Sequence, residues 1–121
     1  MVATITISAV NAVQGFVQAP VALTSTAASI AWNLNTAQNA THVMTENTTL
    51  ANPTNQVAGM TYYFRVTQHA SSAKTLAFGS AYEDSTDMPI ISTTLSAVDI
   101  FVFRSDGTTM SLIDYAANVG A

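Results

Sequence analysis

Hydrophobic and polar residues alternate with a period of two along most of this chain, which is the pattern of half-buried β-strands. The strongest example covers residues 61–67 and predicts that Tyr62, Phe64 and Val66 point inward. Seven further runs show the same alternation more weakly. The predicted strands are 4–8, 20–24, 29–34, 40–45, 61–67, 74–78, 97–103 and 109–113.

Two of the weaker runs also divide cleanly between faces. In 29–34, the larger side chains of Ile30, Trp32 and Leu34 share one face, and a buried Trp32 needs a hydrogen-bond partner for its indole N–H. In 40–45, the two faces carry Ala40, His42 and Met44 on one side and Thr41, Val43 and Thr45 on the other.

Turn residues separate the predicted strands. Asp106-Gly107 is the best hairpin signal, because Gly accepts the positive φ that tight hairpin turns require, and Asn52 and Pro53 favour a loop. Several short strands without a well-patterned helix predict an all-β fold: an antiparallel β-sandwich, jelly-roll-like, of roughly eight short strands. The length of 121 residues predicts a single domain, with 1–25 as an N-terminal arm or first strands and 26–121 as the sandwich module.

The run 98–103 is apolar on both faces. Val98, Ile100 and Val102 lie on one face, and Phe101 and Phe103 lie on the other. A strand of this kind is normally covered on both sides. Either the N-terminal segment or a loop covers the second face, or that face is a subunit interface.

Composition excludes several classes of function. Only 8% of the residues are charged, against about 25% in a typical soluble domain. Three basic residues, Arg65, Lys74 and Arg104, are too few for a nucleic-acid surface. The absence of cysteine excludes disulfides and thiolate chemistry. No signal-peptide pattern and no apolar run of transmembrane length are found, so we expect synthesis in a cytoplasm and no membrane partner.

Polar residues at the ends of the predicted strands have structural explanations. We expect Gln68 and Asp99 to be satisfied by loop backbone, and Asn47 and Asn52 to hold turns. Gly79 fits a strand end or a bulge.

Five segments between residues 30 and 107 occur in an order that resembles a small all-β module of tailed-bacteriophage structural proteins. That resemblance implies a virion building block, often trimeric, with no catalytic residues to transfer to this chain. The stretch 42–46 departs from the module. The segments are IAWNL at 30–34, NTTLANPTN at 47–55, YYFRVTQ at 62–68 after Gly59, KTLAFGSAY at 74–82, and SAVDIFVF at 96–103 before Asp106-Gly107.

Candidate chemistry is sparse. His42 and His69 are the only imidazoles, and their spacing does not indicate a metal site. No Gly-x-Ser-x-Gly elbow supports a Ser-His-Asp triad. The acidic stretch 83–87 is interpreted as a solvated loop, with a loose cation site as the alternative. We therefore predict no catalytic, cofactor-binding or metal-binding residues, and no enzymatic activity.

Taken with the resemblance, these features predict a capsid decoration (cement) protein. It would form a homo-oligomer, as a trimer, bind the major capsid protein on the virion surface and stabilise the head. The alternative is a tail-fibre, spike or tip component that binds a host receptor or glycan. In that case an exposed aromatic such as Tyr63 or Tyr82 would stack against sugar.

Overall fold

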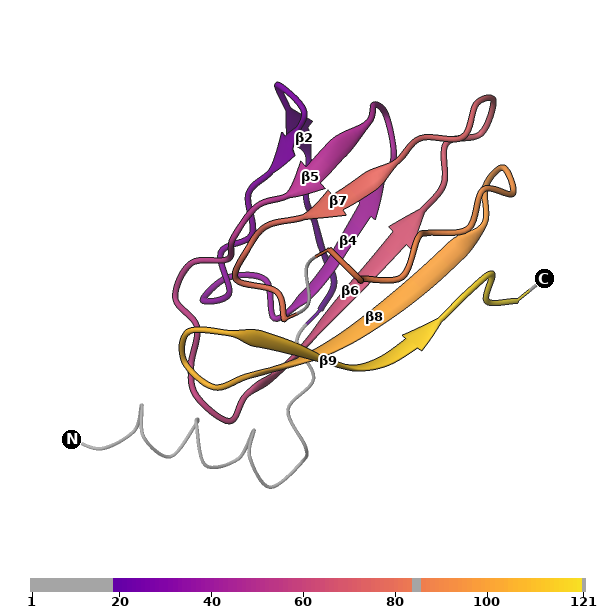
Figure 1. Cartoon of the computed structure of the whole chain (residues 1–121). Coiled ribbons are helices and arrows are strands. Elements are labelled where there is room, and N and C mark those ends of the chain that lie inside the picture. Colours follow the sequence, from indigo (N-terminus) through magenta and orange to yellow (C-terminus); the bar gives the residue numbers. More distant parts are fainter. Residues whose placement is uncertain (1–18, 84–85, 121) are drawn as a thin grey trace.

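The computed structural model describes residues 19–83 and 86–120, and Figure 1 shows their arrangement in two layers. Within these residues the fold is all-β, with nine short strands and no helix. The strands are β1 (Val21–Ala22), β2 (Ser25–Thr26), β3 (Ser29–Ile30), β4 (Asn39–Val43), β5 (Thr48–Leu50), β6 (Thr61–Thr67), β7 (Leu76–Phe78), β8 (Val98–Ser105) and β9 (Met110–Ala116).

The strands form two mixed sheets. A five-stranded sheet has the order β1-β4-β6-β8-β9, and a four-stranded sheet has the order β2-β3-β5-β7. The prediction of an antiparallel arrangement is wrong for four of the seven pairs, because β1–β4, β4–β6, β3–β5 and β5–β7 are parallel.

The parallel pairs follow from how the chain winds between the sheets. From β3 to β8, each successive strand lies in the opposite sheet. Parallel neighbours need a crossover connection, which is usually a helix. Here a strand of the facing sheet supplies the crossover: β5 lies between β4 and β6 along the chain, and β6 lies between β5 and β7.

One apolar core joins the two sheets. The rings of Phe78 on β7 and Phe101 on β8 approach to 5.3 Å between centroids, so side chains of both sheets meet directly. Trp32 is buried among Tyr62, Phe64 and Phe103. Its indole N–H donates to the carbonyl of Ala37 at 2.6 Å, which confirms the predicted need for a partner.

The long central strands match the sequence pattern best. Strand β6 has the predicted bounds, and its inward residues Tyr62, Phe64 and Val66 are at most 2% exposed. Strands β2 and β5 were not predicted. Strand β5 lies in an Asn-rich stretch and is held by pairing with β3 and β7, which the local sequence does not indicate. The predicted strand 4–8 lies outside the described residues.

Within residues 19–25, two short segments take part in the sheets. Strand β1 pairs with β4, and β2 begins at Ser25 and pairs with β3. The first eighteen residues of the proposed 1–25 segment lie outside the described residues.

Polar side chains tie the loops to the sheets as predicted for Gln68. Its amide nitrogen donates to the carbonyls of Lys74 and Ser92, and its oxygen accepts from the N–H groups of His69 and Lys74. Asn52 accepts from the N–H of Ala81, which is far away in the sequence. A Cβ at Gly79 would collide with the Asn52 side chain, so this close approach requires glycine.

Candidate functional site

The outward-facing side of the five-stranded sheet carries the half-buried apolar row of β8. Phe101 and Phe103 are fully buried on the inner side, whereas Val98, Ile100 and Val102 are only partly buried on the other. Strand β8 is therefore apolar on both faces, as its sequence predicts. We call this side the outer face. The residues of this face that concern us are Tyr63, Arg65, Val98, Ile100, Val102, Arg104, Ile113 and Asp114.

Cross-strand pairing builds the centre of the outer face. Tyr63 lies opposite Val102, and Arg65 lies opposite Ile100. Directly opposite residues are close enough for their side chains to pack. Tyr63 remains 43% exposed, so an aromatic ring is offered to a partner beside this apolar row.

A bulge in β9 adds Ile113 to the outer face. The register shifts by one residue between Val102 and Phe103, which leaves Ile113 without an opposite residue. Ile113 lines a depression of about 240 Å³ together with Arg104 and Ser111, and it is 56% exposed. A bulge can redirect a side chain in this way, and no pattern in the sequence indicates it.

The outer face also concentrates the scarce positive charge. Arg65 and Arg104 are two of the three basic residues of the chain, and both are exposed. Asp114, opposite Val102, supplies an acidic neighbour. Arginine and aromatic residues around an apolar centre are the composition typical of protein–protein interfaces.

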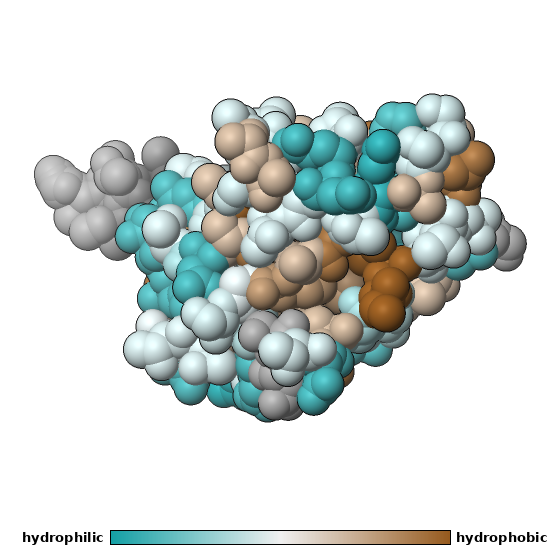
Figure 2. Space-filling model, turned by 45° about the horizontal axis from the view of Figure 1, so that its top comes forward, coloured by the Kyte–Doolittle hydropathy of each residue, from teal (hydrophilic) through white to brown (hydrophobic). Residues whose placement is uncertain are grey.

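Hydrophobic side chains are exposed elsewhere too. Figure 2 shows brown side chains gathered in a hollow that hydrophilic and neutral residues surround. In the segment before β8, Ile90 is 83% exposed and Leu95 is 47% exposed. Apolar exposure is therefore not confined to one face.

Two carboxylates, those of Asp99 and Asp106, accept hydrogen bonds from backbone N–H groups. Burial alone would raise the pKa of Asp99, but hydrogen bonds from Asn118, Tyr115 and Ser92 outweigh burial and hold it below its usual value. Backbone N–H groups of Thr108 and Thr109 lower the pKa of Asp106 in the β8–β9 turn. The predicted role of Asp99 at loop backbone is confirmed.

Glu83, in the acidic stretch 83–87, is attached to β9. Its carboxylate accepts from the hydroxyl of Ser111 at 2.6 Å, and its N–H donates to the carbonyl of Met110. Residues 84–85 of this stretch lie outside the described residues. In 19–83 and 86–120, no three His, Asp or Glu side chains are arranged to hold a metal ion.

The two histidines occupy different environments. His69 lies in the loop after β6, where its Nδ1 accepts from the N–H groups of Ser71 and Ser72 at 3.1 Å. His42 is buried on β4, with Nδ1 2.8 Å from the carbonyl oxygen of Leu23.

The suggested sugar-stacking role fails for Tyr82. Its side chain is 1% exposed, and its hydroxyl donates to the carbonyl of Ala51 at 3.1 Å. Burial raises its pKa. Tyr82 packs in the core against Phe78 and Phe103, so only Tyr63 of the two suggested tyrosines is available to a ligand.

Comparisons with known proteins add no assignment: no family model matches the chain, and neither a curated protein nor a solved structure does. The resemblance to bacteriophage modules therefore stays a prediction. In the part of the chain that the structure describes, no helix is long and apolar enough to cross a membrane.

Proposed function

We propose that this chain is a non-enzymatic structural protein of a tailed-bacteriophage virion. After synthesis in the host cytoplasm it forms a homo-oligomer, a trimer, and binds the major capsid protein as a decoration (cement) protein that stabilises the head. The specific virion role rests on the sequence resemblance. The assembly role rests on the outer face.

The observation that supports the proposal most is the row of Val98, Ile100 and Val102 along the first half of the longest strand, β8. These side chains are only partly buried although they lie between two neighbouring strands. Contact with a second protein surface would remove the row from water, and about 25 cal/mol per Å² of apolar area favours such burial. Arg65 and Arg104 would supply polar contacts at its border.

The sheet edge supports the same proposal. Strand β9 ends the five-stranded sheet, and beyond the short bridge of Met110 to Tyr82 its edge can pair with another chain. Closed assembly of identical copies satisfies such edges and avoids open-ended aggregation.

As part of the proposal, we describe the two facing sheets as a β-sandwich. The contact between Phe78 and Phe101 across the sheets supports this description. The parallel pairs count against a jelly-roll winding, because a jelly roll is built from antiparallel strands.

The test is the oligomeric mass of the full chain in sedimentation velocity. In Ile100→Glu, the new carboxylate lies opposite Arg65 and is tolerated within one subunit, but its burial against a second surface is unfavourable. We expect the wild type to sediment as a trimer and Ile100→Glu as a monomer.

The matched control places the same residue on the other sheet. Ala77 on β7 is exposed, and Ala77→Glu is expected to leave the mass unchanged. A monomeric wild type, or equal masses for the wild type and Ile100→Glu, would contradict assembly through the outer face. A trimer that does not cosediment with capsids would contradict the decoration role alone.

The alternative role is a tail-fibre, spike or tip component that recognises a host receptor or glycan. The exposed ring of Tyr63 beside Arg65 favours keeping this candidate. It predicts that the purified oligomer binds host surface polysaccharide and that Tyr63→Ala abolishes binding. A negative screen with folded protein would count against it.

A further inference from the structure

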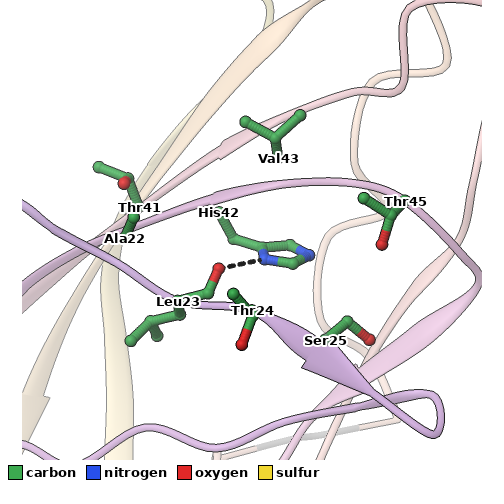
Figure 3. Close-up of a pocket in the computed structure, with 8 residues that line it drawn as sticks. All are labelled: Ala22, Leu23, Thr24, Ser25, Thr41, His42, Val43 and Thr45. Carbon is green, nitrogen blue, oxygen red and sulfur yellow. Dashed lines mark hydrogen bonds between the residues drawn. The ribbon is translucent and has the colours of Figure 1, made fainter.

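A pocket lies at the open edge of the molecule where the chain passes from β1 in one sheet to β2 in the other (Figure 3). Its volume is about 410 Å³. The lining combines apolar groups with hydroxyl groups and includes one imidazole, that of His42. The apolar members are Ala22, Leu23 and Val43, and hydroxyl members include Thr24, Ser25 and Thr45.

His42 is placed in this pocket by the alternation of β4. It shares the inner face with Ala40, which is fully buried, and its own side chain is only 3% exposed. Figure 3 shows Nδ1 bonded to the carbonyl of Leu23, with Nε2 pointing toward the side where Ser25 and Thr45 lie. Nε2 is buried and has no hydrogen-bond partner among the described residues.

The bond to Leu23 fixes the chemistry of the other ring nitrogen. A carbonyl oxygen only accepts, so Nδ1 must carry the proton of the neutral imidazole. Nε2 then holds a lone pair and is a hydrogen-bond acceptor. A buried acceptor without a donor is unfavourable, so this arrangement favours a ligand that brings a donor to Nε2.

The surroundings define what kind of donor fits. Among the described residues, no charged side chain lines the pocket, and Glu46 lies close enough to His42 to interact with it electrostatically. The negative charge of Glu46 disfavours an anion. Its Oε2 already accepts from the hydroxyl of Ser25 at 2.6 Å and from the N–H of Ala28 at 3.1 Å. A protonated amine would therefore lose its hydration for mostly neutral partners.

A hydroxyl group satisfies both sides of the pocket. It can donate to Nε2 of His42 and accept from a threonine hydroxyl. The alkyl group of Leu23, on the same side of β4 as the imidazole, provides surface for an apolar body (Figure 3). We propose that this pocket binds a small amphipathic alcohol, with one hydroxyl donating to His42 Nε2 and an apolar body against Leu23. This proposal is independent of the proposed virion role.

The turn between β2 and β3, which lies next to this pocket, has an unusual backbone conformation. Ala27 and Ala28 both have positive φ, 53° and 60°, a conformation that L residues other than glycine adopt at a cost. The bond from Ala28 N–H to Glu46 holds this turn, and Ser25 of the same hairpin lines the pocket. The pocket wall is thus built from a tightly constrained segment.

The test uses phenol as the probe and anisole as its matched control. Both carry an apolar ring, but anisole has no hydroxyl to donate. The ¹⁵N shift of His42 Nε2 in the full chain is followed by NMR at pH 8 while each compound is added. We expect phenol to move the Nε2 resonance saturably, in the direction of hydrogen-bond acceptance, and anisole to leave it in place.

The matched protein variant is His42→Asn. The asparagine amide can keep the bond to the Leu23 carbonyl, whereas the acceptor at Nε2 is lost. We expect phenol to bind this variant about fivefold to tenfold more weakly, as for one lost neutral hydrogen bond. Equal phenol affinity for the wild type and His42→Asn, or equal binding of anisole and phenol to the wild type, would overturn the proposal.

The wild-type ring signal decides the question if His42→Asn does not fold. A phenol-dependent shift of Nε2 that anisole does not reproduce supports the site. An Nε2 resonance that phenol leaves unmoved shows that phenol does not donate a hydrogen bond to this nitrogen, and the proposal is then wrong.

Discussion

Two buried polar side chains on the inner face of the same sheet differ in how fully their hydrogen-bonding groups are satisfied. Asp99 on β8 is 1% exposed, and its carboxylate accepts from the N–H groups of Ser92 and Asn118 and from the hydroxyl of Tyr115. His42 on β4 is 3% exposed, yet it makes one bond and leaves Nε2 without a partner in the described residues.

Position in the sheet explains the difference. Strand β8 has a long neighbour on each side, and loop residues near positions 92 and 118 converge on Asp99. Strand β4 has β6 on one side but only the two-residue β1 on the other. A buried charge is tolerated only with saturated hydrogen bonds, whereas a neutral ring next to a short edge strand can keep one position open. The comparison separates a structural polar group from one available to a ligand.

Among the substitutions considered, Asp99→Asn is expected to change the free energy of unfolding most. The variant keeps the shape of the side chain, but its NH₂ group faces donors and its charge-assisted hydrogen bonds are lost. We expect the free energy of unfolding to fall by about 2–4 kcal/mol, from the weakening of hydrogen bonds to a charged group and an unsatisfied donor. Urea unfolding at pH 7 measures this change.

Asp106→Asn is the control for Asp99→Asn. Asp106 also accepts two backbone N–H groups, from Thr108 and Thr109, but it lies in an exposed turn. Asp106→Asn should lower the free energy of unfolding clearly less than Asp99→Asn does, because water can reach the backbone groups that Asp106 leaves free. Equal losses at the two positions would contradict the view that burial makes Asp99 critical.

The second expected effect is that Asp99 makes the free energy of unfolding depend on pH. Its pKa is lowered in the folded protein, so its contribution to stability is present above the unfolded value of about 3.9 and is lost as the pH falls through that value toward the folded pKa. We expect the difference in unfolding free energy between the wild type and Asp99→Asn to shrink below about pH 5. Glu46 and Asp106, whose pKa values are also lowered, are common to both proteins and cancel.

Urea unfolding of both proteins at a series of pH values tests this expectation. A difference that stays constant between neutral and acidic pH would show that the hydrogen bonds do not lower the pKa of Asp99.

Alternation along the chain divided the residues of both strands correctly between two faces, but it did not indicate the contrast between Asp99 and His42. Phe101, Phe103 and the loop-bonded Asp99 follow from the period of two on β8. His42 was placed correctly on the face of Ala40 and Met44. Its open nitrogen depends on where Leu23 lies, and that contact comes from a parallel strand pair that local pattern does not encode.

The same limit applies to the outer face. The two-sided apolar character of β8 can be read from Val98 to Phe103, because it depends only on alternation. The exposure of Ile113 depends on a register shift between β8 and β9, which is decided by pairing rather than by local sequence. Features set by one strand were predictable, whereas features set by the meeting of two strands were not.

The smallest change in the free energy of unfolding is expected from His42→Phe. This substitution removes the imidazole, of which only one nitrogen is hydrogen-bonded, but keeps a flat side chain of similar size. The bond to the Leu23 carbonyl is lost, but that carbonyl belongs to a half-buried residue lining the pocket, where water can replace the imidazole. Removing the unpartnered Nε2 also relieves an unfavourable buried acceptor. The two changes oppose each other, so the free energy of unfolding should change by less than about 1 kcal/mol. A loss in urea unfolding as large as that of Asp99→Asn would mean that His42 is a structural group like Asp99, and that the contrast between the two sites does not hold.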